Sequence, residues 1–407
     1  MADKCARKPL EGLKVLDMGR MFAAPYAGQM LGDLGADVIK VEHPAGDEMR
    51  HFGPHFLKST DGEELLESTY SLSCNRNKRS VVIDLTREAG REAAARLAAW
   101  ADVVLENFKV GDLARYGLDY ETVRAINPGV IYCSVTGFGQ DGPYARQPGV
   151  DTMFQAMSGM MSVTGEPDGP PQRIGYIVVD IATGLFATTA VLAALRDRDM
   201  NGGEGQQIDL ALFDTAFALL SHRAMEFLMA GVNPMRRGSS SSGNVPGRNM
   251  PTREGVLTLQ AGGQSQFRKL CDVLGLSHLA DDPRFATARD RAANERSLMD
   301  MLEAEFAKRT AAEWYDILRE AGVCAAPLNT VSQAFDDQQV KHRGVRQETP
   351  HPKAGTVSLI ANPIRFSRSP MEGGKAPPLL GADTDAVLSG LGFDARQIRA
   401  AQGLEDA

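Results

Sequence analysis

The first 136 residues alternate short apolar runs with helical stretches, and this alternation limits the possible folds most strongly. The apolar runs lie at residues 13–18, 36–42, 80–84, 101–106 and 129–135, and helical stretches such as 27–34 and 87–100 lie between them. Strands that alternate with helices form βαβ units, which place parallel strands in one sheet covered by helices. We therefore predict an α/β fold whose large domain has a Rossmann-like, mostly parallel sheet.

The chain has 407 residues, which is more than one hydrophobic core usually serves, so two domains are expected. Residues 234–249 are rich in Ser and Gly and form the most linker-like stretch. A second set of strands and helices follows it, which predicts a smaller α+β domain. We assign residues 1–225 to the large domain, completed by residues 331–407, and residues 226–330 to the small domain. The last predicted helix covers Thr384 to Leu391.

Charge and cysteine usage exclude several classes of protein. The net charge is −8 and no basic arm is present, which argues against a nucleic-acid partner. The five cysteines are scattered without a CxxC pair and the seven histidines do not cluster, so we expect reduced thiols and no metal site. Residues 1–10 are polar and no run of 18 apolar residues occurs, which favours a cytoplasmic protein with no membrane contact. No GxGxxG motif follows the first predicted strand, so a dinucleotide-binding fingerprint is missing there, and Walker A and GxSxG motifs are absent from the chain.

One carboxylate stands at the junction of a predicted strand and a predicted helix. The apolar run 174–179 reads as a buried strand, and a helix is expected over residues 182–195. Asp180 between them would be the helix N-cap, where backbone N–H groups and the helix dipole favour an ionised carboxylate. This edge of an α/β sheet is also where ligands bind. From these residues alone, an ordinary cap and a nucleophile both remain possible.

Seven segments, in this order along the chain, are similar to the class III CoA-transferase family, which also includes acyl-CoA racemases. They are residues 9–17, 32–42, 75–80, 106–108, 137–143, 179–184 and 377–381. The resemblance implies an interlocked homodimer of two ring-like subunits. It also implies acyl-CoA and a small carboxylic acid as substrates, with coenzyme A as co-substrate and no permanently bound cofactor.

The resemblance also assigns roles to site residues. It makes Asp180 the nucleophile, which forms a mixed anhydride with the acyl group and then an aspartyl-CoA thioester. Gly262, Gly263 and Gln264 match the family's glycine loop over the active site, where backbone N–H groups stabilise oxyanions. A tight turn explains these glycines equally well. Asp151 is placed near the site, where it either orients substrate or acts as a buried cap.

Coenzyme A recognition is expected mainly on the large domain. The loop Arg20, Met21, Phe22 and Ala23 would face the thioester end, and the other candidates are His43, Lys78, Arg79, Asn107, Phe108 and Arg115. Basic side chains among them would bind the phosphates. His43 stands where several relatives carry a phosphate-contacting Arg, which puts that contact in doubt. For any single basic residue, a solvated surface charge is the commoner outcome.

The residues also favour a transferase over a racemase. Racemases of the family carry a Gly-His-Asp segment whose His removes the α-proton, whereas this chain has Val150 at that position. Segments 73–80 and 132–140 are most similar to succinyl-CoA:dicarboxylate transferases, so glutarate or itaconate is the expected acceptor type. Its second carboxylate would bind Arg20 or Arg173. Formate with oxalate, a carnitine-like acid, or a non-catalytic acyl-CoA binder in which Asp180 only caps a helix are the alternatives.

Overall fold

The computed structural model describes residues 7–241, 243–369, 371 and 374–404. The chain divides into two compact units, which are described separately. Unit 1 comprises residues 1–158, 174–224 and 341–407, and unit 2 comprises residues 159–173 and 225–340. These boundaries differ from the predicted domains mainly at residues 159–173 and 331–340, which belong to unit 2 although the prediction placed them in the large domain.

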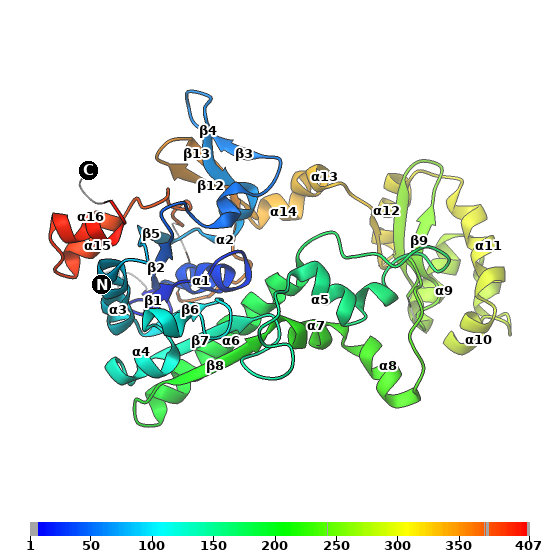
Figure 1. Ribbon diagram of the computed structural model, residues 1–407. Helices are drawn as coiled ribbons and strands as arrows, with labels where there is room; N and C mark the ends of the chain where they lie inside the picture. The colour runs from blue at the N-terminus through cyan, green and yellow to red at the C-terminus, as the bar shows by residue number, and fades with distance from the viewer. Residues whose placement is uncertain (1–6, 242, 370, 372–373, 405–407) are drawn as a thin grey trace. The chain divides into compact units, whose positions relative to one another are not determined.

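Unit 1 is built on a six-stranded parallel sheet (Figure 1). Its strands are β1 (Lys14–Asp17), β2 (Asp37–Glu42), β5 (Lys78–Val82), β6 (Val103–Glu106), β7 (Ile131–Thr136) and β8 (Gln206–Ala211). Their order is β5-β2-β1-β6-β7-β8, and every neighbouring pair is parallel. Counted along the chain, this is the 3-2-1-4-5-6 order of the Rossmann fold. The expected parallel α/β sheet is confirmed, and its order reverses between β1 and β6.

Helices cover both faces of this sheet. On one face, α3 (Glu88–Trp100) and α4 (Tyr120–Ile126) bury a core that contains Leu16, Ile39 and Val104. The other face is covered by α1 (Ala23–Asp33) and α6 (Val178–Met200), which pack against each other. Gly184 of α6 permits this approach, because a Cβ there would lie 2.8 Å from the carbonyl oxygen of Ala23. Within the described part of the chain, α6 alone is long and apolar enough to span a membrane by length and composition, but one side of it is buried in unit 1, where it packs on α1.

The remaining elements of unit 1 are shorter. They are β3 (Phe56–Lys58), β4 (Glu64–Ser68), α2 (Thr69–Cys74), α5 (Asp151–Met157), α7 (Leu212–Leu220), β12 (Arg346–His351), β13 (Gly355–Ile360), α15 (Thr384–Gly390) and α16 (Ala395–Ala401). The tail returns to the sheet, because the side chains of Asp383 and Thr384 accept the N–H groups of Ser80 and Val82 at 2.9 and 3.0 Å.

Two sequence expectations about these elements are wrong. Residues 174–179 form no strand. Residues 174–177 are a loop, and α6 already begins at Val178. Val179 is fully buried as a helical residue, and a short apolar run does not distinguish a buried strand from a buried helix turn. Thr384–Gly390 is also not the last helix, since α16 follows it. Strand β8 was not predicted, because its sequence, QQIDLA, has several polar residues and no continuous apolar run. This composition is typical of a strand at the edge of a sheet.

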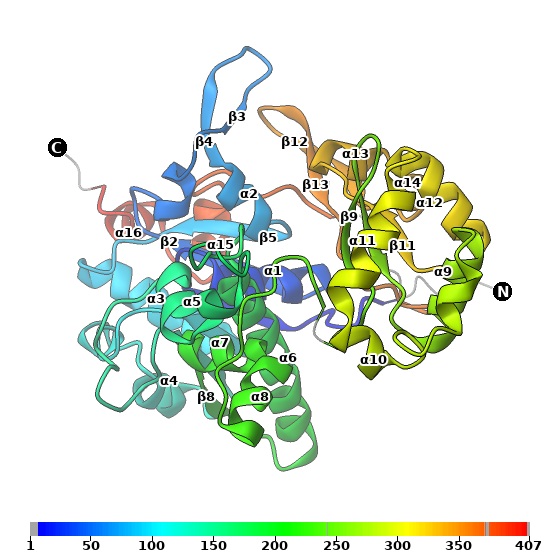
Figure 2. The ribbon, with the colours of Figure 1, turned by 90° about the vertical axis from the view of Figure 1, so that its right-hand side faces the viewer.

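Unit 2 has an antiparallel sheet and a helical layer (Figure 2). Strands β9 (Gly247–Pro251), β10 (Val256–Gln260) and β11 (Ala325–Pro327) pair in the order β11-β10-β9. Helices α9 (Gln264–Val273), α11 (Glu295–Phe306) and α12 (Ala311–Glu320) supply much of its buried core. The other helices are α10 (Ala288–Ala293) and α13 (Val331–Asp336). Both α8 (His222–Ala230) and α14 (Gln338–His342) span a division between the units.

Candidate active site

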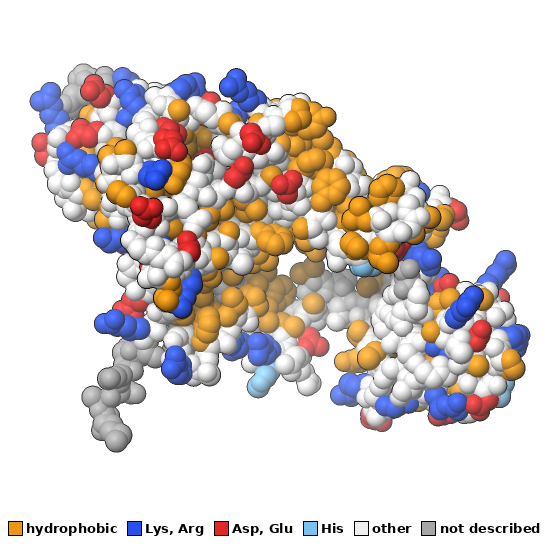
Figure 3. Space-filling model, turned by 90° about the horizontal axis from the view of Figure 1, so that it is seen from below, with side chains coloured by type: hydrophobic (Ala, Val, Ile, Leu, Met, Phe, Trp, Pro, Cys, Tyr) orange, Lys and Arg blue, Asp and Glu red, His pale blue; other side chains and the backbone are white. Residues whose placement is uncertain are grey.

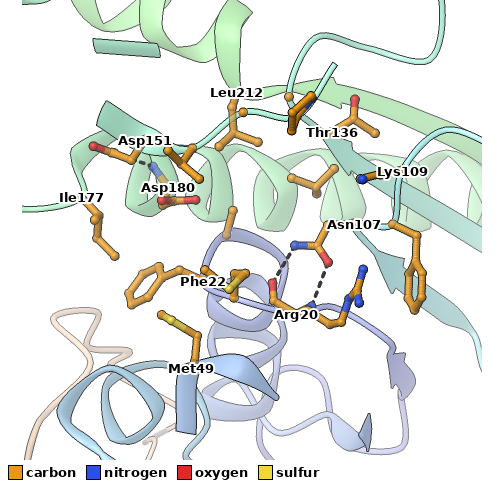
Figure 4. A pocket seen from close by; sticks show the side chains of 18 of the residues that line it. Arg20, Phe22, Met49, Asn107, Lys109, Thr136, Asp151, Ile177, Asp180 and Leu212 are labelled. Carbon is orange, nitrogen blue, oxygen red and sulfur yellow. Dashed lines mark hydrogen bonds between the residues drawn. The ribbon is translucent and has the colours of Figure 1, made fainter. Parts of the chain in front are cut away.

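A cavity of about 530 Å³ opens in unit 1 where the strand order reverses. Residues 20–23 after β1, residues 107–110 after β6 and residues 135–137 at the end of β7 line it. Ile177, just before α6, and Asp180, in its first turn, also line it (Figure 4). In open α/β sheets, ligands bind at the carboxyl ends of strands at this reversal point. The topology therefore identifies this cavity as the candidate active site.

Asp180 contributes to the cavity a carboxylate that has no hydrogen-bond or ion-pair partner among the residues that the structure describes. It stands in the first turn of α6 and its side chain caps no N–H group. Asp151 is the cap instead, because its Oδ2 accepts the N–H groups of Val179 at 2.8 Å and Asp180 at 3.3 Å. The other oxygen of Asp151 accepts Nε2 of Gln155 at 2.5 Å. The predicted N-cap role of Asp180 is thus wrong, and the capping alternative for Asp151 is the one observed.

The electrostatics of Asp180 differ from the sequence expectation as well. Burial, followed by the negative charge of Asp151, raises the pKa of Asp180 from 3.8 to about 7. The helix N-terminus was expected to favour the ionised form. Burial has the larger effect in the opposite direction, and Asp151, which accepts the N–H groups of Val179 and Asp180, adds its negative charge beside Asp180. The carboxylate that remains is more basic than an exposed one.

Asn107 holds the loop that follows β1. Its Oδ1 accepts the N–H of Arg20 at 2.8 Å, and its Nδ2 donates to the carbonyl oxygen of Arg20 at 2.6 Å (Figure 4). The guanidinium of Arg20 lies 4.4 Å from the ring centroid of Phe108. Arg20 and Lys109 are the basic residues among those described around the cavity, and neither forms an ion pair with a described residue. Both cations are therefore available to an anionic ligand.

The buried ion pair between Lys40 and Asp47 also holds the loop that follows β1. Nζ of Lys40 donates to Asp47 at 3.0 Å and to the carbonyl oxygen of Gly19 at 2.7 Å. Asp47 accepts the N–H of Met21 at 3.1 Å, and Met21 has a φ of +62°, which is strained for a side chain other than Gly. Sequence reasoning missed Lys40 and Asp47. The available signal was a lysine in the middle of an apolar strand.

Apolar side chains form one wall of the cavity. Phe22, Ala23 and Met21 from the predicted loop line it, and Met49 and Ile177 join them. Sequence reasoning also missed Lys109, Phe52, Tyr70, Gln147, Thr152 and Leu212, which line the cavity as well. They come from segments far apart in the chain, so no local motif marks them.

Lys78 does not have its predicted role in phosphate binding. Its fully buried ammonium group donates to Asp17 at 2.8 Å, to the carbonyl oxygen of Pro25 at 2.6 Å and to Asn75 at 2.8 Å. A lysine has three N–H donors, and all three are used here. This prediction is corrected: Lys78 holds β1, α1 and the start of β5 together.

Three other predicted coenzyme A residues lie outside the described lining of this cavity. Arg79 pairs with Asp37 at 2.6 Å, and Arg115 pairs with Asp112 at 3.0 Å. The ring of His43 accepts the N–H of Ala45 at 3.1 Å through Nδ1. Their contacts with coenzyme A remain predictions.

The glycine loop belongs to unit 2. Gly262 packs so closely on Asn244 that a Cβ would lie 2.0 Å from its Oδ1, which explains the need for glycine there. Gly263 precedes α9, whose first residue is Gln264. The fully buried Arg291 donates to the carbonyl oxygen of Gly262 and, at 2.9 Å, to Oε1 of Gln264. The loop is therefore fixed from inside unit 2, and its catalytic role remains a prediction.

The chain matches the family model described as CoA-transferase family III over residues 10–384. It is 43% identical over 393 residues to the succinate–glutarate CoA-transferase of Agrobacterium fabrum, covering 96% of this chain and 98% of that protein. It is 39% identical over 388 residues to the succinyl-CoA:glutarate CoA-transferase of Mus musculus, covering 95% and 87%. A crystal structure of a CaiB/BaiF family protein from Brucella suis is similar with a TM-score of 0.85 and 43% identity, covering 95% of this chain and 100% of that one.

Proposed function

Because this chain belongs to CoA-transferase family III, it is an enzyme of the transferase type, and we propose that it moves coenzyme A from succinyl-CoA to a free dicarboxylic acid. The relatives named as glutarate transferases support this substrate class. The predicted family is thereby confirmed. The observation that carries the proposed chemistry is the carboxylate of Asp180, which lines the same cavity as Arg20 and Lys109. None of the three side chains forms an ion pair with a described residue.

In the proposed mechanism, an oxygen of Asp180 attacks the thioester carbonyl of succinyl-CoA. The C–S bond breaks, which leaves a mixed anhydride on Asp180 and the thiolate of coenzyme A. The thiolate attacks the aspartyl carbonyl, releases succinate and forms an aspartyl-CoA thioester. The acceptor carboxylate then attacks that thioester, and the thiolate finally takes the acceptor acyl group from the new anhydride. Asp180 is regenerated, and no ATP is needed because one thioester replaces another.

The raised pKa of Asp180 fits a nucleophile that works near neutral pH. A more basic carboxylate attacks a carbonyl more readily, but only its ionised form reacts. Activity should therefore fall as the pH drops below about 7. Backbone N–H groups of the loop Gly262, Gly263 and Gln264 are proposed to stabilise the oxyanions, as the family resemblance implies.

Arg20 and Lys109 are proposed to bind anionic groups of the substrates, including the distal carboxylate of a dicarboxylate. Arg173 was the other predicted candidate, and it belongs to unit 2. A monocarboxylate would leave the cation without a partner. Val150 lines the cavity where the racemases carry a histidine, and an aliphatic side chain cannot remove an α-proton. This observation favours transfer over racemisation.

Two measurements test the proposal. Hydroxylamine added during turnover with succinyl-CoA should trap an aspartyl hydroxamate on the peptide that contains residues 175–185, and mass spectrometry would detect it. A panel of acceptors then compares glutarate, itaconate and succinate with acetate, oxalate and a carnitine-like acid. Trapping on another residue would reject Asp180 as nucleophile. Faster transfer to acetate, oxalate or the carnitine-like acid than to every dicarboxylate would reject the substrate class.

We also propose the interlocked homodimer that the family resemblance implies, in the cytoplasm. Exposed apolar side chains on unit 1 support a protein partner: Leu185, Phe186 and Leu192 on α6 and Phe217 on α7 are each more than a third exposed. Apolar side chains also gather in the view from below (Figure 3). Interlocked rings cannot separate without unfolding, so analytical ultracentrifugation should show a dimer even at nanomolar protein. A folded, active monomer would refute this architecture.

A further inference from the structure

A second cavity, of about 570 Å³, lies in unit 1 at the opposite edge of the parallel sheet. Asp33, at the end of α1, and Arg76 and Asn77, just before β5, contribute to its lining. Because the strands are parallel, residues before β5 lie at the amino edge of the sheet, whereas the Asp180 cavity lies at the carboxyl edge. We call it the amino-edge cavity. Its position separates it from the candidate active site.

The described lining of the amino-edge cavity contains one carboxylate, and that carboxylate is already fully bonded. Oδ1 of Asp33 accepts Nε of Arg76 at 2.8 Å and Nδ2 of Asn77 at 2.7 Å. Oδ2 accepts Nδ2 of Asn362 at 2.8 Å and Nη2 of Arg76 at 2.5 Å. Asp33 is buried, so these bonds hold the inner wall rigid. No acceptor charge is left there for the other cations.

Five permanent cations line the cavity: Lys8, Arg76, Arg343, Arg346 and Arg365. Arg346 pairs with Glu348 at 2.8 Å, whereas Lys8, Arg343 and Arg365 form no ion pair with any residue that the structure describes. This concentration of positive charge occurs in a chain whose net charge is −8. A hollow lined by one sign of charge attracts and concentrates ligands of the opposite sign.

We propose that the amino-edge cavity binds a small molecule that carries two or more phosphate or carboxylate groups. Guanidinium groups match both kinds of anion with paired N–H donors. The side chain of Gln347 adds an amide, and Ile364 and Phe366 add an apolar wall for the body of such a ligand. The volume lies within the range of about 300 to 1,000 Å³ that is usual for ligand sites.

Isothermal titration calorimetry of the whole protein at low salt tests this inference, with pyrophosphate as the phosphate probe and citrate as the carboxylate probe. The test variant combines Arg343→Gln and Arg365→Gln, both at exposed positions. Arg124→Gln on α4 is the matched control for an exposed arginine outside the cavity. Arg20→Gln reports any binding of the same probe at the Asp180 cavity.

We expect the double variant to weaken binding of the preferred probe by about tenfold or more. Arg124→Gln and Arg20→Gln should leave that affinity unchanged. The probe that binds more tightly identifies the anionic group. Absence of binding by both probes would overturn the proposal. This is also the result that would be observed if a second copy of the chain covered the cavity. The proposal would also be overturned if Arg124→Gln weakened binding of the probe as much as the double variant does. The same holds if Arg20→Gln weakened binding and the double variant did not.

Discussion

Replacing Asp180 with Asn should make the protein more stable at high pH while abolishing transfer. The amide has nearly the size of the carboxylate but carries no charge. Burial and Asp151 raise the pKa of Asp180 from 3.8, its value in the unfolded chain, to about 7 in the folded chain. Between pH 3.8 and about 7, the folded state therefore binds more protons than the unfolded state. The stability of the wild type therefore falls as the pH rises through this window. Asp180→Asn removes that loss.

The structure sets the size of the effect. The pKa of Asp180 rises from 3.8 to about 7. This corresponds to at most about 4 kcal/mol per chain above pH 7 and to almost nothing below pH 4. Solvent in the open cavity reduces the figure. Activity should fall on the order of 10³-fold or more, because an amide does not form the anhydride.

Urea unfolding followed by circular dichroism, at fixed protein concentration from pH 4 to pH 8, measures the difference between variant and wild type. Asp214→Asn is the matched control, because Asp214 is an exposed aspartate in the first turn of α7. Its curve should run parallel to that of the wild type. An Asp180→Asn variant that is less stable by about 1 kcal/mol at every pH would show an ordinary helix cap and refute this reasoning.

Three further changes test the surroundings of the site. Asp151→Asn removes the charge beside Asp180 and should move the acid limb of the pH–rate profile to lower pH; an unmoved limb would contradict the electrostatic coupling. Asn107→Ala removes two hydrogen bonds from the loop after β1, so steady-state kinetics should show a higher KM for succinyl-CoA with the fold retained, and an unchanged KM would count against the positioning role. Lys78→Met leaves Asp17 buried without its partner and should cost about 3 to 5 kcal/mol in urea unfolding. A stable Lys78→Met variant with weak coenzyme A binding would instead restore the phosphate-binding role.

Local patterns were sufficient for much of unit 1. The apolar runs that became β1, β2, β5, β6 and β7 carry their own signal, because strand and helix periods are properties of neighbouring residues. The same reasoning failed at residues 174–179, where the apolar run is a loop and a helix start. It also missed β8, whose polar sequence lacks the signal. Family membership was likewise readable, since ordered motifs survive in the sequence itself.

The roles of the charged residues depended on tertiary structure. Sequence placed Asp180 at a helix start, but only the fold brings Asp151, 29 residues away, to the N–H groups that Asp180 was expected to accept. The same holds for Lys78, whose ammonium meets Asp17 across 61 residues. A charge is stabilised by whichever partners surround it after the chain has folded, and sequence spacing does not specify those partners. The sequence alone therefore determined the sheet, the family and the nucleophile candidate, whereas the tertiary structure decided that Asp151 caps the helix and that Asp180 has no partner among the described residues.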